Sequence, residues 1–157
     1  HPRQRVVRLR EADRDISIVR QELAANPQNA ELVSNLLRLY METGQPDLAK
    51  AQLEESARTF GDSPEFLRFA VDFSNANGLW QAGLEPARKL SQLAANDPNI
   101  WLLLARFEFA NRDFNAFAAA ARRAIQLGGV QAKMAIANDP LYLMARGSPD
   151  FQKLLQQ

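Results

Sequence analysis

The fold is decided by residues 98–127, which read PNIWLLLARFEFANRDFNAFAAAARRAIQL. The first part of this stretch carries apolar residues at the spacing of one helical stripe, at Ile100, Trp101, Leu104 and Ala105. The second part carries another such stripe, at Phe114, Phe117, Ala121, Ala124 and Ile125. A polar break at residues 111–113 separates the two stripes. This pattern predicts two helices joined by a short turn.

The same pattern of two helices and a turn recurs along the chain with a period of 34 residues. The three windows are residues 30–63, 64–97 and 98–131. An alternation of apolar and polar residues with period two, which would indicate β-strands, is nowhere sustained. The sequence therefore predicts an all-α protein that is built from three imperfect helical repeats.

The turns of the three windows fall at equivalent positions, at Gly44, Gly78 and Arg112. Glycine after a helix adopts the left-handed backbone conformation that ends the helix, so the first two positions indicate helix stops. The second window departs from the others because Pro86 stands inside its second helix. Proline lacks a backbone N–H donor, so this residue predicts a kink or a delayed start of that helix.

The segments on either side of the repeats have the features of caps. Residues 1–29 form a predicted N-terminal helix or half repeat, and residues 132–157 a predicted C-terminal cap. In the cap, Ser148 followed by Pro149 predicts the start of a last helix. Repeats and caps together predict a single domain over residues 1–157. Because the chain opens on His1 without an initiator methionine, we expect it to be a fragment of a longer protein.

The third window resembles a tetratricopeptide repeat, in which the first helix carries a large residue, a leucine and a small residue, and the second helix carries another small residue. Trp101, Leu104, Ala105 and Ala124 occupy these positions. The resemblance covers roughly residues 13–128. It implies a right-handed α-α superhelix with N- and C-terminal capping helices. It also implies a non-catalytic protein–protein interaction scaffold, which binds a partner peptide or helix in a concave groove.

The composition argues against several classes of function. The 19 basic and 18 acidic residues give a net charge of +1, which is too small for a nucleic-acid binder. The chain has no cysteine, and its one histidine is His1, so it offers neither a metal site nor a catalytic set. No apolar stretch approaches the length of about 18 residues that a membrane span needs. We therefore predict a soluble protein that is not an enzyme and uses no cofactor.

In tetratricopeptide-repeat proteins the first helices of successive repeats line the groove, and the resemblance implies this role for a set of residues here. They are Asn35, Arg38, Met41, Arg68, Asp72, Asn75, Arg106 and Phe109. Arg38, Asp72 and Arg106 are spaced by 34 residues, so we expect them to form a row. Because guanidinium groups pair well with carboxylates, an acidic peptide or C-terminus is one natural partner. Alternatively, the row is a self-satisfied ladder of surface salt bridges, which contributes little.

Two other functions remain open. A series of arginines crowds the first helix, at Arg3, Arg5, Arg8, Arg10 and Arg14. Such a segment could follow a missing membrane anchor in a membrane-attached assembly or secretion factor, or it could be a plain solvated helix. The chain could also be a regulatory docking domain of an enzyme whose catalytic part lies outside it. The sequence does not distinguish a cytoplasmic from a periplasmic location, and it determines neither the partner's identity nor the oligomeric state.

Overall fold

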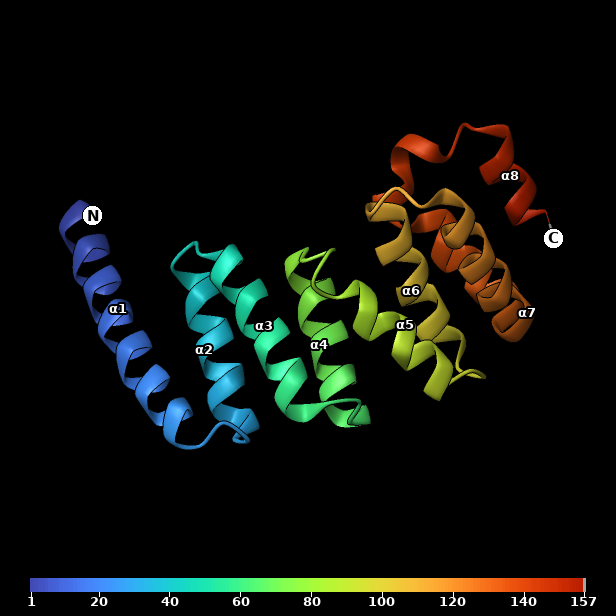
Figure 1. The fold of residues 1–157 in the computed structure, drawn as a ribbon. Coiled ribbons are helices and arrows are strands. Elements are labelled where there is room, and N and C mark those ends of the chain that lie inside the picture. Colours follow the sequence, from blue (N-terminus) through green and yellow to red (C-terminus); the bar gives the residue numbers. More distant parts are fainter. Residues whose placement is uncertain (157) are drawn as a thin grey trace. The chain divides into compact units, whose positions relative to one another are not determined.

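Helices make up the regular structure of the computed structural model, which describes residues 1–156 (Figure 1). In chain order they are α1 (Pro2–Ala25), α2 (Ala30–Glu42), α3 (Pro46–Phe60), α4 (Pro64–Asn77), α5 (Leu84–Leu93), α6 (Pro98–Ala110), α7 (Phe114–Asn138), the 3-10 helix η1 (Pro140–Ala145) and α8 (Pro149–Leu155). The helices α2, α4 and α6 begin at the first residue of the three predicted windows. The predicted all-α helical-repeat class is confirmed.

The chain packs as two compact units, residues 1–66 and residues 67–157. The first unit holds α1, α2, α3 and the first residues of α4, and the second holds the rest. Each unit buries apolar residues of its own. The prediction of one domain over the whole chain therefore stays a prediction.

In the first unit α2 packs against both α1 and α3 and supplies more buried apolar residues than any other helix. Its apolar residues recur every three or four positions and are almost completely buried, namely Val33, Leu36, Leu37, Leu39 and Tyr40. Ile16 and Leu23 cover this stripe from α1, and Ala49 and Leu53 cover it from α3. Burying one such leucine side chain contributes about 2 kcal/mol relative to leaving it in water.

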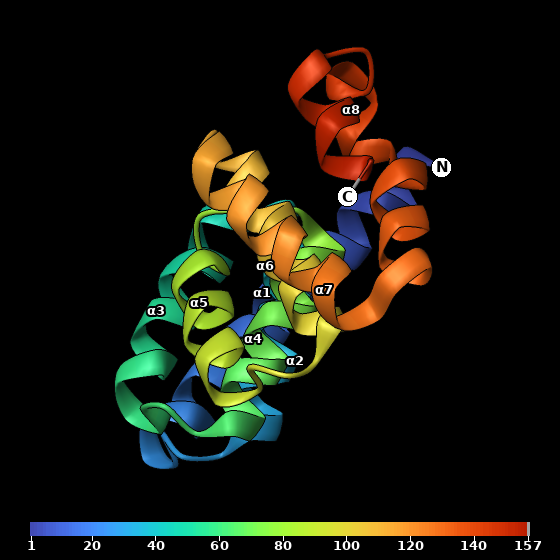
Figure 2. The ribbon, with the colours of Figure 1, turned by 90° about the vertical axis from the view of Figure 1, so that its right-hand side faces the viewer.

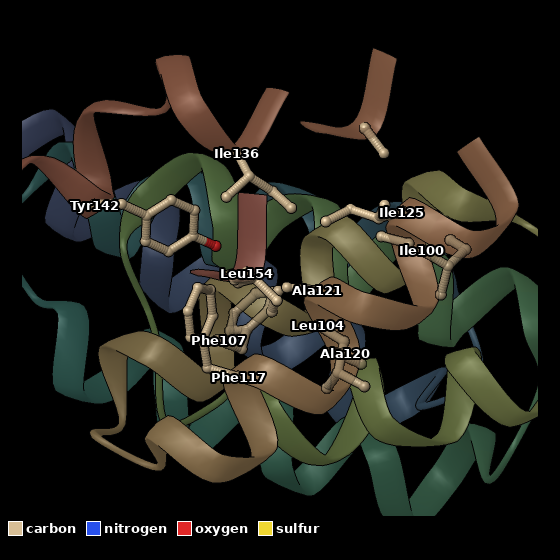
Figure 3. Packing of buried hydrophobic residues seen from close by; sticks show 14 of the residues in the cluster. Ile100, Leu104, Phe107, Phe117, Ala120, Ala121, Ile125, Ile136, Tyr142 and Leu154 are labelled. Carbon is tan, nitrogen blue, oxygen red and sulfur yellow. The ribbon is translucent and has the colours of Figure 1, made fainter. Parts of the chain in front are cut away.

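In the second unit the core takes in buried residues of α4, α5, α6 and α7 and continues into the C-terminal segment (Figure 3). Ala105 on α6 and Ala121 and Ala124 on α7 are completely buried. Their small side chains allow the two helices to approach closely. Larger buried residues belong to the same core, among them Ile100 and Phe107 (Figure 3).

The turns between the paired helices share a residue with positive φ at the equivalent position. Gly44 has φ of 69° and Gly78 has φ of 66°, which is the left-handed region that glycine adopts without strain. Arg112 takes the same conformation, with φ of 63°, although it carries a side chain. The predicted equivalence of the three turn positions is therefore confirmed, and the third turn carries backbone strain that the first two avoid.

The second window departs from its neighbours as the sequence indicates. Its second helix, α5, begins only at Leu84, so Pro86 stands in the first turn, where no backbone donor is required. The predicted delayed start is confirmed. Gly83 just before the helix is required by packing, since an added Cβ would lie 2.4 Å from Cε1 of Phe107 and 2.6 Å from Cβ of Ser74.

The C-terminal segment folds back on α6 and α7. Gly129 interrupts α7 with a left-handed backbone (φ 61°, ψ −136°), and α7 changes direction there (Figure 2). Beyond it, α8 begins at Pro149 with the Ser148 hydroxyl accepting a hydrogen bond from the N–H of Phe151, which confirms the predicted start. Tyr142, Phe151 and Leu154 are at most 4% exposed, so this segment closes the core of the second unit.

Candidate partner-binding surface

The predicted groove residues lie on the first helices of the three windows. Asn35, Arg38 and Met41 belong to α2 in the first unit. In the second unit, α4 carries Arg68, Asp72 and Asn75, and α6 carries Arg106 and Phe109. The contacts of these side chains differ strongly from one another.

On α2, Arg38 is an exposed cation with one surface partner. Its Nη1 lies 2.8 Å from Oε1 of Glu42, one helical turn further on, and both side chains are more than half exposed. An exposed pair of this kind is worth about 0–1 kcal/mol, so a ligand carboxylate can replace Glu42 at little cost. Asn35 and Met41 are half-buried beside it.

On α4, Arg68 repeats this arrangement. Its Nε lies 3.5 Å from Oδ2 of Asp72, again one turn further on, with both side chains more than half exposed. Asp72 therefore has its ion-pair partner on its own helix. The three charges of the predicted row take their partners outside that row, since Arg38 pairs with Glu42 and Arg106 pairs with Asp139.

Arg106 differs from these two arginines because its guanidinium group is held on several sides. Its Nε donates to Oδ1 of Asn75 at 2.9 Å, and its Nη1 forms an ion pair with Asp139. The guanidinium carbon lies 5.6 Å from the ring centre of Trp80, within the range of a cation–π contact. With its side chain 27% exposed and that of Asp139 13% exposed, this pair is sheltered from water.

Asp139 connects this cluster to the start of η1. Its Oδ1 accepts a hydrogen bond from the N–H of Leu141, and its carbonyl oxygen accepts one from Nη2 of Arg146. Sequence analysis missed Asp139. The available signal was its position, because it lies 33 residues after Arg106, one residue short of a further repeat. It also directly precedes Pro140, and aspartate before a proline commonly caps a helix.

Phe109 belongs to a cluster of aromatic rings. Its ring centre lies 4.9 Å from that of Tyr142, 5.3 Å from that of Phe117 and 5.5 Å from that of Phe114, each in an edge-to-face arrangement. Tyr142 is 1% exposed, and this burial raises the pKa of its hydroxyl above the usual value. Phe109 therefore anchors the C-terminal segment and leaves only part of its ring for a partner.

A second sheltered ion pair, also missed by the sequence analysis, joins α5 to α6. Nε and Nη2 of Arg88 contact the two carboxylate oxygens of Glu108 at 2.6 Å and 3.2 Å. The Glu108 side chain is 3% exposed, so it depends on this two-point contact for its hydrogen bonds. The hydrogen bond to Glu108 raises the pKa of Arg88, which stays charged in any case.

The first unit also has a groove that the sequence analysis did not foresee. It has a volume of about 410 Å³ and runs between α1 and α3, with Leu36 and Tyr40 of α2 at its base. Arg20 crosses it, because Nε donates to the Tyr40 hydroxyl at 2.7 Å and the guanidinium group lies over the Tyr40 ring. The groove therefore has an apolar floor and a central cation that is already engaged.

In residues 1–156, histidine, aspartate and glutamate side chains form no group of three or more that could hold a metal ion. None of the helices in the same range combines the length and the apolar character that crossing a membrane requires.

Comparisons with known proteins agree with this architecture. Residues 8–70 match the sequence model of a family described as tetratricopeptide repeat. The crystal structure of MamA is similar in fold, with a TM-score of 0.56 and 20% sequence identity, over 92% of this chain and 87% of that chain. At this identity the likeness shows the fold alone. A comparison with curated proteins gave no match.

Proposed function

We propose that this chain, whose residues 8–70 match the tetratricopeptide-repeat family, is a non-catalytic scaffold that binds an acidic segment of another protein. Two arginines support this proposal most directly, each within its own unit: Arg38 in the first and Arg68 in the second. Both lie on first helices of the repeats, both are more than half exposed, and both have only a surface partner one turn away.

An acidic partner follows from the chemistry of these two side chains. A guanidinium group presents several N–H donors in one plane and can hold a carboxylate through two parallel hydrogen bonds. The existing contacts to Glu42 and Asp72 are exposed, so exchanging them for a ligand carboxylate costs little. A net gain is expected where the ligand shields the new pair from water.

The other predicted residues take different roles in this proposal. Asn35 offers an amide for backbone groups of the ligand, and Met41 offers a flexible apolar contact. Asn75, Arg106 and Phe109 already have internal partners. We assign to these three residues the shaping of the surface of the second unit through the C-terminal segment. Direct ligand contact is proposed at Arg38 in the first unit and, separately, at Arg68 in the second.

The experiment is a crosslinked pull-down from lysate of the source cells, with the partner identified by mass spectrometry. The test variant is Arg38→Glu/Arg68→Glu. The control is Arg58→Glu/Arg122→Glu, which makes the same charge change at exposed arginines of the second helices α3 and α7. Circular dichroism first establishes that all forms are equally helical.

We expect a partner that the wild type and the control capture and that the test variant loses. The captured segment should be rich in aspartate and glutamate, and a synthetic peptide of that segment should compete. Equal capture by the test variant would show that these arginines form only solvated surface pairs.

A further inference from the structure

The N-terminal part of α1, residues 2–14, is a helical arm with little cover from the rest of the first unit. Every residue in it is exposed except Ala12, which is half-buried. The α1 helix has 24 residues and α2 has 13, so α1 is longer by about 16 Å at 1.5 Å per residue. Figure 1 shows the N-terminal half of α1 standing away from α2.

Positive charge is concentrated on this arm. Residues 1–10 contain Arg3, Arg5, Arg8 and Arg10 and no acidic residue, which gives +4 at a neutral His1 side chain. The whole chain has a net charge of +1, so the remaining residues sum to −3. Within the part of the chain that the structure describes, the four guanidinium groups form no ion pair.

An apolar stripe runs along the same arm. Leu9, Ile16 and Leu23 are seven residues apart and therefore lie on one side of α1. Ile16 and Leu23 are 7% and 9% exposed in the core of the first unit, whereas Leu9 is 42% exposed. Val6, 48% exposed, lies one turn before Leu9. The stripe that binds α1 to its own unit thus continues beyond the cover of that unit.

The arginines lie on both sides of the uncovered stripe. At about 100° per residue, Arg5 falls on one side of Leu9 and Val6, and Arg10 falls on the other. Apolar residues flanked by charges of one sign are the arrangement by which helices in a coiled coil select a partner of opposite charge.

We propose that this arm docks an acidic amphipathic α-helix of another protein, with apolar residues of that helix on Val6 and Leu9 and its carboxylates on Arg5 and Arg10. This surface is distinct from Arg38 and Arg68, so it stands or falls independently of the function proposed above. A protein helix fits better than an anionic membrane, because the exposed stripe is narrow and holds no aromatic residue.

The test uses the full chain and a synthetic fluorescent peptide of three heptads, with leucine at the a and d positions and glutamate at the e and g positions. Fluorescence anisotropy compares the wild type with Arg5→Glu/Arg10→Glu and with Val6→Ser/Leu9→Ser. The control is again Arg58→Glu/Arg122→Glu. A peptide of the same composition with its leucines scattered around the helix tests for charge attraction alone.

We expect both arm variants to weaken binding by about tenfold or more, because each removes one of the two complementary features. The affinity of the control variant for the amphipathic peptide should stay within about twofold of the wild-type value. The peptide with scattered leucines should bind the wild type only as weakly as the amphipathic peptide binds the arm variants. Equal binding of the two peptides, or an unchanged affinity of the serine variant, would overturn the proposal. The proposal would also be overturned if the protein sedimented with vesicles of phosphatidylcholine and phosphatidylserine and did not bind the amphipathic peptide.

Discussion

Arg106 of α6 and Asp139 form an ion pair that links the start of η1 to α6. The pair is sheltered from water, and each partner has further hydrogen bonds that fix its position. It differs in this respect from the exposed pairs of Arg38 and Arg68, and it makes the C-terminal segment part of the second unit.

A double-mutant cycle measures this pair. Arg106→Met and Asp139→Asn should each destabilise the protein, and their coupling energy should be about 1–2 kcal/mol, as for partly buried charged partners. Urea unfolding followed by circular dichroism gives the four free energies of unfolding. The exposed pair of Arg38 and Glu42 serves as the control cycle and should couple by less than about 0.5 kcal/mol. Equal coupling in the two cycles would contradict the structural role of Arg106.

The strained turn at Arg112 predicts a stabilising substitution. Arg112→Gly should raise the free energy of unfolding by about 0.5–1 kcal/mol. The left-handed conformation costs a residue with a side chain about 1–2 kcal/mol, and glycine avoids this cost. Part of the gain is offset because glycine loses more chain entropy on folding. The matched control is Arg122→Gly inside α7, which should lower stability by about 1 kcal/mol. Thermal and urea unfolding measure both variants. A loss of stability in Arg112→Gly would mean that the side chain makes a contact that outweighs the strain.

The close packing around Gly83 predicts that a substitution at this position destabilises the protein. Gly83→Ala should cost about 1–3 kcal/mol, because the added methyl group overlaps the ring of Phe107 and the side chain of Ser74. Gly147→Ala is the control, since nothing lies within 4 Å of the added carbon. Urea unfolding compares the two variants with the wild type. Similar stabilities for both would show that Phe107 moves aside at no cost.

Burial of Tyr142 predicts a loss of stability at alkaline pH. The hydroxyl pKa is raised in the folded state and is about 10 in the unfolded state, so above about pH 10 the unfolded chain binds fewer protons. Stability then falls as pH rises, by at most about 1.4 kcal/mol per pH unit from this group. Tyr142→Phe should remove that share of the slope. Urea unfolding at several pH values between about 9 and 11 measures it, and parallel curves for the wild type and Tyr142→Phe would contradict the assignment.

Much of the fold could be predicted because it depends on local patterns. The windows at residues 30, 64 and 98 were read from apolar stripes and polar breaks, and helices begin at those residues. Pro86 was enough to predict the late start of α5, since the missing N–H acts within a single turn. Ser148 predicted the start of α8 for the same local reason.

The candidate surface was harder to predict. The period of 34 residues placed Arg38, Asp72 and Arg106 at equivalent positions, and it suggested that they would act together. Arg38 and Asp72 instead pair within their own helices, at a spacing of four residues that a helix brings together. Equivalence in the repeat therefore did not decide which charged groups meet.

The helices, their turns and the stripes that they bury follow from local sequence, because each of these depends on residues a few positions apart. Which arginines remain available to a partner depends instead on how the helices pack. Arg106 is engaged because the fold brings Asn75 and Asp139, 31 and 33 residues away, to its guanidinium group. The arginines of the α1 arm are exposed because α2 is too short to cover the longer helix. Such contacts depend on how whole segments dock, and no local spacing encodes them.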